Sequence, residues 1–197
     1  MKQGTPGEKW MMVVLCGGLE PSGRNMDEQI SNYLKRRCVA LSLEFPISKD
    51  QLWQLISRGG NLNECHPFCL ANDVINWDEN SHVDKLVYLN GLTYIRRFLN
   101  WNEGEGYDLL IGKEEGPQSY VNWEISQIDE NKSSLTITVY PYLLTSMNKI
   151  FSFLPFILYI RPKLKNYLKS VLNGFLYFSN NGKPVPRNQW GKHSWFS

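Results

Sequence analysis

The clearest pattern of apolar and polar positions lies near the end of the chain, between residues 162 and 178. Apolar side chains recur there with the i, i+3, i+4, i+7 spacing of an amphipathic helix, kept for about three turns. Pro162 suits the first turn of such a helix, and Gly182 and Pro184 prevent its continuation. The apolar positions are Leu164, Tyr167, Leu168, Val171, Leu172, Phe175 and Leu176. The pattern predicts a long helix with one apolar face that needs a partner surface.

Most of the chain between residues 36 and 142 follows the two-residue alternation of β-strands instead. Asn90-Gly91 is a strong signal for a two-residue hairpin turn. The clean alternation of Ser134–Tyr142 indicates a sheet with one buried face and one solvated face. The predicted strands are Arg37–Phe45, Cys69–Trp77, His82–Leu89, Leu92–Trp101, Tyr107–Gly112, Ser119–Ile128 and Ser134–Tyr142.

Three further helices are expected. Ser48 and Gln51 have the spacing of a capping box, which predicts a helix beginning at Ser48. Asp27–Lys35 predicts a short helix, and Thr145–Ile160 predicts a partial helix that Pro155 breaks or kinks. The order is strand, helix, antiparallel strands, long helix. A curved antiparallel sheet of about seven strands wrapped around the C-terminal helix fits this order, because it buries both apolar faces in one α+β domain.

Three segments of the chain, "LEFPISKDQLWQLIS", "NLNECHPF" and "YLKSVLNGFLYFSNNGKPV", resemble the START-like (SRPBCC) superfamily, which has a helix-grip fold and includes polyketide cyclase/dehydrase-like proteins. The resemblance covers about residues 36–182 and rests on element order and periodicity, not on a catalytic signature. Residues 1–35 are then an N-terminal extension. Residues 183–197 are a tail whose apolar side chains predict that it packs back on the domain. The resemblance implies a cavity between sheet and helix that holds a small apolar or amphipathic molecule.

His66 has two interpretations. In Glu64-Cys65-His66-Pro67 it could serve as a general base or as a polar anchor at the cavity edge. The alternative is a ring that packs beside Pro67 and bonds a backbone carbonyl. We favour the alternative, because no catalytic partner is identifiable in the sequence.

Arg96 is the sharpest indication of a polar ligand group. Both faces of its strand are mixed, so either Arg96 or Arg97 must point toward the apolar side, where a cation needs a partner. We favour a protein carboxylate such as Glu124; a ligand carboxylate would suggest a fatty acid or a polyketide-like phenol. We favour a cavity over a filled core, although for each wall residue taken singly, ordinary packing is the simpler interpretation. The residues expected at the ligand are His66, Tyr94, Arg96, Phe98, Trp123, Leu168, Leu172 and Phe175.

Charge and cysteine content narrow the function further. The net charge of +2 gives no electrostatic case for nucleic acid. A metal site would use Cys65, His66 and Cys69, but no second ligand pair exists, so no metal is expected. No phosphate-binding loop or nucleophile elbow is present, so no cofactor is expected. The four cysteines, Cys16 included, are expected to be free thiols in a reducing compartment.

Two apolar runs bear on membranes. Trp10–Cys16 is short for a signal peptide, and Ile150–Ile160 is about half the length of a spanning helix. No transmembrane segment is predicted, and a cytoplasmic location follows by default. Phe151–Ile160 could be core, a flap over the cavity, or a peripheral contact with a membrane or partner. We favour core, because the run has almost no polar residue.

The sequence therefore predicts a non-catalytic protein, monomeric or weakly dimeric, that carries or sequesters a small apolar or amphipathic molecule. One alternative is an enzyme of the cyclase, aromatase or hydratase kind, using His66 and an arginine in the same cavity. The other is an interaction module that docks through residues 150–160.

Overall fold

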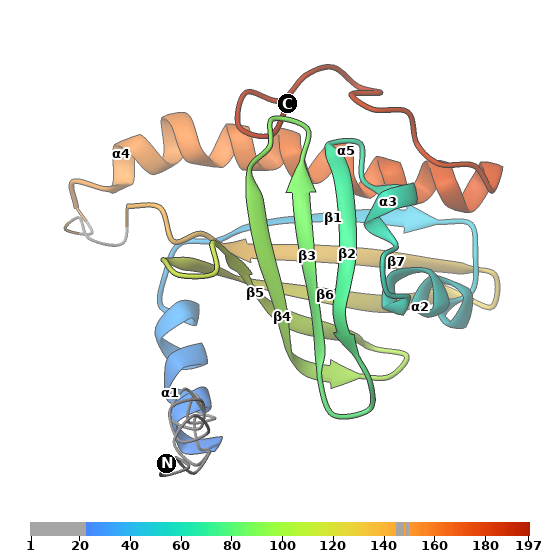
Figure 1. Cartoon of the computed structure of the whole chain (residues 1–197), viewed down its shortest axis with the longest axis horizontal. Coiled ribbons are helices and arrows are strands. Elements are labelled where there is room, and N and C mark those ends of the chain that lie inside the picture. Colours follow the sequence, from blue (N-terminus) through green and yellow to red (C-terminus); the bar gives the residue numbers. More distant parts are fainter. Residues whose placement is uncertain (1–22, 145–147, 149) are drawn as a thin grey trace, which may run out of the picture.

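A seven-stranded antiparallel sheet forms the centre of the molecule (Figure 1). The computed structural model describes residues 23–144, 148 and 150–197 of the chain. The strand order is β1-β7-β6-β5-β4-β3-β2, so every neighbouring pair except β1 and β7 is consecutive in the chain. The strands are β1 Val39–Phe45, β2 Cys69–Trp77, β3 His82–Tyr88, β4 Thr93–Asn102, β5 Gly106–Gly112, β6 Gln118–Asp129 and β7 Lys132–Tyr140.

One long helical segment crosses the concave side of this sheet. It begins with α4, Phe153–Pro155, continues through a π-helical turn, η1 Phe156–Ile160, and ends with α5, Arg161–Asn181. Gly182 adopts a left-handed conformation and caps the end. The structure confirms the predicted α+β fold, a curved antiparallel sheet around a C-terminal helix.

Three smaller helices lie outside this pair of layers: α1 Gly23–Leu34, α2 Lys49–Ser57 and α3 Leu62–Cys65. The capping box is confirmed, since Ser48 accepts the amide of Gln51 and the Gln51 side chain accepts the amide of Ser48. The single turn of α3 was not predicted. It lies in the segment that leads from α2 into β2.

Pro155 does not break the helix, although the π-helical turn η1 begins directly after it. Pro155 lies in the first turn of the long helical segment, where a missing backbone N–H removes no hydrogen bond. The backbone therefore continues as helix from Phe153 to Asn181. Part of the predicted helix Thr145–Ile160 falls on residues 145–147 and 149, which lie outside the described residues. The apolar run Trp10–Cys16 also lies outside the described residues.

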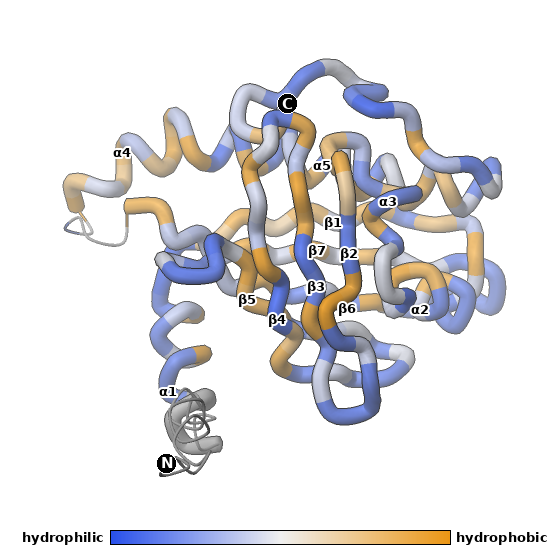
Figure 2. The backbone as a smooth tube through the Cα atoms, viewed as in Figure 1, coloured by the Kyte–Doolittle hydropathy of each residue, from blue (hydrophilic) through white to orange (hydrophobic). Residues whose placement is uncertain are grey.

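The core interpretation of Phe151–Ile160 is also wrong. Only Ser152, Phe156 and Ile160 are buried in that run, because the helix extends past the edge of the sheet (Figure 1). Ile157 is partly buried against the core, whereas Phe151, Phe153, Leu154, Leu158 and Tyr159 are exposed. Figure 2 shows the hydrophobic colouring of this projecting end.

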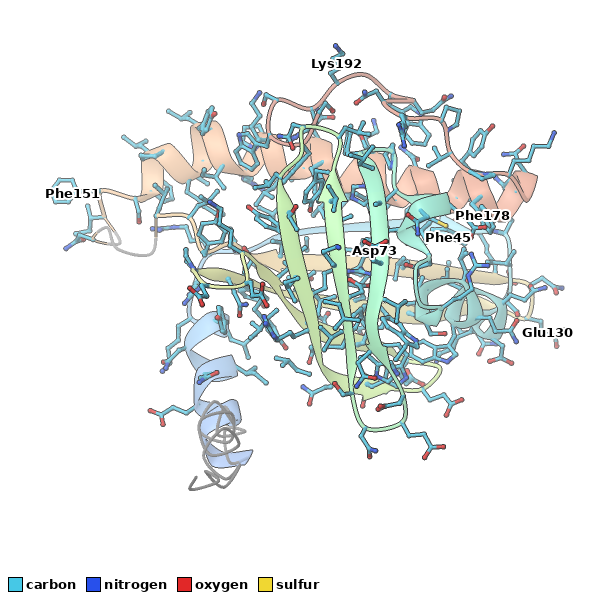
Figure 3. The ribbon with its side chains drawn as sticks, viewed as in Figure 1. Phe45, Asp73, Glu130, Phe151, Phe178 and Lys192 are labelled. Atoms are coloured by element: carbon cyan, nitrogen blue, oxygen red, sulfur yellow. The ribbon has the colours of Figure 1, made fainter. Side chains whose placement is uncertain are left out.

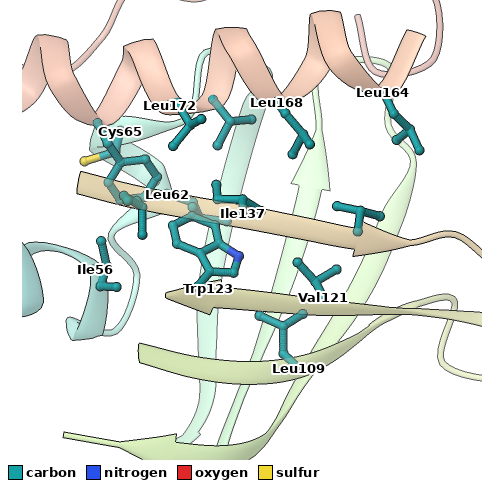
Figure 4. Close-up of a cluster of buried hydrophobic side chains, with 14 of the residues drawn as sticks. Ile56, Leu62, Cys65, Leu109, Val121, Trp123, Ile137, Leu164, Leu168 and Leu172 are labelled. Carbon is teal, nitrogen blue, oxygen red and sulfur yellow. The ribbon is translucent and has the colours of Figure 1, made fainter. Parts of the chain in front are cut away.

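The core lies between α5 and the sheet. α5 contributes Leu164, Leu168, Leu172 and Phe175, each buried, and Figure 4 shows several of them facing Ile137, Val121 and Leu109 on the strands. Irregular pairing in β2 and in β4, between Phe98 and Trp101, bends the sheet around the helix.

The tail, residues 183–197, runs back along α3, α5 and the β3–β4 end of the sheet. The amide of Val185 donates to the carbonyl of Glu64 at 2.8 Å, and the amide of Asn188 donates to that of Pro67 at 2.9 Å. Phe196 stacks on Tyr88 with ring centroids 4.3 Å apart. These contacts bring the end of the chain to the space between the sheet and α5, where Trp195 and Phe196 line a cavity.

Candidate ligand-binding site

A cavity of about 440 Å³ lies between the sheet and the first half of α5. Apolar side chains from β3 to β7, from η1 and from α5 make most of its wall, and Trp195 and Phe196 of the tail close one side. Its lining residues are Leu62, His66, Leu86, Tyr88, Leu92, Tyr94, Arg96, Leu109, Ile111, Ser119, Val121, Trp123, Ile137, Val139, Pro141, Tyr142, Leu143, Tyr159, Ile160, Leu164, Tyr167, Leu168, Val171, Trp195 and Phe196.

Five of the eight residues expected at a ligand line this cavity: His66, Tyr94, Arg96, Trp123 and Leu168. The remaining three do not. Phe175 meets Trp123 edge to face at 5.3 Å, and Leu172 is fully buried beside it, so the space between helix and sheet is filled at that end. Phe98 belongs to a separate aromatic cluster, with Trp77 at 5.1 Å and Tyr107 at 5.0 Å. The cavity thus occupies only one half of the interface between sheet and helix.

His66 is held through both ring nitrogens. Its Nδ1 accepts the backbone amide of Phe68 at 3.1 Å, which places the ring proton on Nε2. Nε2 then donates to the hydroxyl of Tyr167 at 2.9 Å. Burial, followed by the positive charge of Arg96, lowers the pKa of His66 to about 3, so the ring is neutral at pH 7. The expected bond to a backbone carbonyl is replaced by one from a backbone amide.

The hydrogen-bonded chain continues from Tyr167 to Tyr88, whose hydroxyl oxygens lie 3.1 Å apart. Burial raises the pKa of Tyr167 to about 12 and that of Tyr88 well above its usual value, so both hydroxyls keep their protons. His66, Tyr167 and Tyr88 each have one proton to donate, but only two hydrogen bonds join the three side chains. Among the described residues nothing else accepts from these groups, so one hydroxyl proton remains available to an acceptor in the cavity.

Arg96 does have a buried protein partner, but Glu124 is not that partner. Glu124 is exposed, whereas Asp84 lies directly opposite Arg96 on β3 and is fully buried. Arg96 Nε donates to Asp84 Oδ1 at 2.7 Å, and Nη2 donates to Oδ2, which makes a two-pronged ion pair. The charge of Arg96 is therefore compensated before any ligand arrives.

Sequence reasoning missed Tyr88, Tyr167 and Asp84 as polar groups of the site. Tyr167 was assigned to the apolar face of the helix, and nothing in its spacing indicated a hydroxyl partner. Asp84 could have been found, since it shares the inward parity of Leu86 and Tyr88 in β3. A carboxylate at a buried strand position requires a partner, and Arg96 lies in the next strand.

Two cysteines lie close to His66 but form no metal centre. Burial raises the pKa of the Cys65 thiol and of the Cys69 thiol to about 12, so neither is a ready thiolate ligand. Both nitrogens of His66 are already used. Within residues 23–144, 148 and 150–197, no group of three or more His, Cys, Asp and Glu side chains could hold a metal ion.

We expect His66 to make folding pH-dependent. Unfolded histidine titrates near 6.5 and folded His66 near 3, so the unfolded chain binds more protons between these values. Stability therefore falls as the pH drops below 6.5, by up to about 1.4 kcal/mol per pH unit. Between pH 7 and pH 4.5, the free energy of unfolding should fall by about 2–3 kcal/mol more for the wild type than for His66→Gln. Urea unfolding at the two pH values measures this difference. Equal losses in the two proteins would contradict the burial of a neutral imidazole.

No family model matches the sequence, and no curated protein matches it. Solved structures share the fold at low sequence identity. A START superfamily protein from Mycobacterium smegmatis has a TM-score of 0.58 at 8% identity, over 74% of this chain and 99% of that one. The protein XoxI from Bacillus cereus gives 0.56 at 17% identity, over 73% and 96%. The Zhui aromatase/cyclase from Streptomyces sp. R1128 gives 0.54 at 12% identity, over 73% and 93%.

Proposed function

We propose that this chain, which has the START-like helix-grip fold, binds a small, mainly apolar molecule in the cavity between its sheet and α5. The single observation that carries the proposal is the cavity itself. Its volume of about 440 Å³ and its apolar wall with a few converging polar groups are typical of small-molecule sites. The molecule would lie lengthwise between Leu168 on the helix and Val121 on the sheet.

The polar groups favour a neutral ligand with one hydrogen-bond acceptor. The spare hydroxyl proton of Tyr88 or Tyr167 suits a ketone, ester or ether oxygen. A carboxylate is less suited, because Asp84 already compensates the charge of Arg96. A buried anion without a partner costs on the order of several kcal/mol, as much as breaking a buried ion pair. This preference departs from the amphipathic acid that the sequence suggested.

Binding is favoured over catalysis by the state of His66. A general base needs a pKa near the working pH, whereas that of His66 is about 3 and its two nitrogens are engaged within the protein. The aromatase/cyclase activity in the name of one similar structure belongs to that protein. We therefore propose no reaction for this cavity.

Filling the cavity should weaken ligand binding. Val121 lines the cavity from β6, so Val121→Trp places an indole in the space that a ligand needs. We expect the affinity for the uncharged fluorescent probe N-phenyl-1-naphthylamine to fall at least about tenfold, measured by fluorescence titration. Val74→Trp, which adds the same side chain at an exposed position of β2, should bind as the wild type does. A wild type that does not bind the probe, or a Val121→Trp variant that binds it as tightly as the wild type does, would contradict the proposal.

Competition between the probe and two ligands tests the preference for a neutral acceptor. 2-Undecanone and undecanoate have chains of the same length but differ in head-group charge. At pH 8 we expect the ketone to displace the probe at a concentration about tenfold lower than undecanoate does. Equal competition would contradict the neutral-ligand preference and leave the cavity as the binding site.

A further inference from the structure

Six exposed apolar side chains lie at the start of the long helical segment and in the turn just before it. They are Ile150, Phe151, Phe153, Leu154, Leu158 and Tyr159, called the apolar tip below. Ile150 is 79% exposed, and Phe151 and Leu158 are each 73% exposed. Figure 1 shows α4 at one extreme of the long axis of the molecule, and Figure 3 shows Phe151 pointing away from the rest of the fold. A cluster of this size at a protruding end requires a contact to cover it.

The charges of the chain are segregated around this end. All 19 Asp and Glu residues fall in residues 1–130, whereas residues 131–197 contain nine of the 21 Lys and Arg residues. Arg161, Lys165 and Lys169 recur at every fourth position on the exposed side of α5, directly after the apolar tip. Arg37 lies at its base, 5.4 Å from the centre of the Phe153 ring. The apolar tip is thus followed by a row of cations with no acid on the same helix.

The cavity reaches the apolar tip. Tyr159 belongs to both, since it is 54% exposed and also lines the cavity. Ile160 and Leu164 continue the cavity wall from the same helical segment, and the ring of Trp195, another lining residue, contacts Tyr159 at 6.0 Å. A surface that covers the apolar tip therefore also contacts one wall of the cavity.

We infer that the apolar tip inserts into the surface of an anionic lipid bilayer. Exposed aromatic and aliphatic side chains followed by cations are the composition that binds at the interface of an anionic membrane. A protein partner would need a matching surface of about 800 Å², whereas a protruding end meets a planar bilayer without one. The contact is peripheral, since no described helix is long and apolar enough to cross a bilayer. If the proposed function holds, the ligand enters the cavity from the lipid phase.

Cosedimentation of the full chain with lipid vesicles tests this inference. We expect binding to vesicles of equal phosphatidylcholine and phosphatidylglycerol, and binding at least tenfold weaker to phosphatidylcholine alone. Replacing Phe151, Leu154 and Leu158 together with Ser should weaken binding at least about tenfold, since it removes the inserting surface. The matched control replaces three exposed apolar residues of the sheet with Ser: Leu70, Ile75 and Ile128. That control should bind as the wild type does.

A charge-reversal pair separates the electrostatic part. Arg161→Glu combined with Lys165→Glu should weaken vesicle binding by at least about fivefold for each cation removed. Salt at 0.5 M should also weaken vesicle binding by the wild type, because it screens the charges. Lys183→Glu with Arg187→Glu makes the same charge change in the tail, beyond the other end of α5, and should have a smaller effect. All variants should keep binding N-phenyl-1-naphthylamine. A failure of membrane binding can therefore be distinguished from a failure of ligand binding in the cavity.

Three results would overturn the inference. The first is a wild type that binds neither vesicle composition. The second is unchanged binding after the Phe151, Leu154 and Leu158 replacements, which would assign the lipid contact to another part of the chain. The third is concentration-dependent dimerisation in sedimentation velocity that these replacements abolish, without vesicle binding, which would make a second copy the occupant.

Discussion

Replacing Arg96 with Met should lower the free energy of unfolding by about 3–5 kcal/mol. The side chains of Arg96 and Asp84 are 4% and 0% exposed, so the substitution leaves a fully buried carboxylate without its cation. Breaking a buried pair from one side is costly because the remaining charge keeps its desolvation penalty and loses the attraction that offset it. Urea unfolding monitored by tryptophan fluorescence would measure the loss.

A double variant distinguishes this cause from lost packing. Asp84→Leu combined with Arg96→Met removes both charges, and it should recover most of the stability that Arg96→Met loses. Arg97→Met is the matched control in the same strand, because Arg97 is only half-buried, and we expect it to change stability by less than about 1 kcal/mol. An Arg96→Met loss as small as that of Arg97→Met would contradict a buried pair.

Gly174→Ala should destabilise the protein by about 2–4 kcal/mol, although alanine is the better helix former by about 1 kcal/mol. A Cβ at Gly174 would overlap the carbonyl oxygen of Cys65 and would lie 3.1 Å from Cδ of Pro67. The overlapping atom belongs to the backbone of α3, which cannot move without disturbing His66 and the start of β2. Gly174 therefore allows the close approach of α5 to the segment containing Cys65.

Thermal unfolding would measure this effect, at about 2–4 °C per kcal/mol for a chain of this size. Asn173→Ala is the control at the preceding position of α5. It gives a smaller gain in helix propensity and adds no Cβ, so it should leave the melting temperature unchanged or slightly raised. If Gly174→Ala raised the melting temperature, the helix and α3 would have to be farther apart than the structure has them.

The sequence by itself determined the elements and their order. The apolar positions from Leu164 to Leu176 predicted α5, the alternation of Ser134–Tyr142 predicted β7, and Asn90-Gly91 placed the turn between β3 and β4. These signals are local, since they depend on side chains within four positions of one another or on single turns. The order then left few ways to bury both apolar faces, so the sheet wrapped around a helix followed.

The pairing of the site's residues was decided by the tertiary structure. The alternation of β3 marks Asp84 as inward-facing, but only the strand register sets it opposite Arg96. The hydroxyl of Tyr167 meets His66, which is 101 positions away in the sequence. Contacts of this range depend on how strands align and how the helix lies over them, which residue types alone do not specify.

The extent of the cavity and the exposure of the apolar tip have the same origin. Phe175 fills one half of the interface because its ring reaches Trp123, whereas the side chains around Leu168 do not close the other half. Phe151 and Leu158 looked like core residues because they are apolar, but the sheet ends before the helix does. A sequence states which side chains would gain from burial, and only the relative lengths and curvature of the packed elements decide which of them are buried.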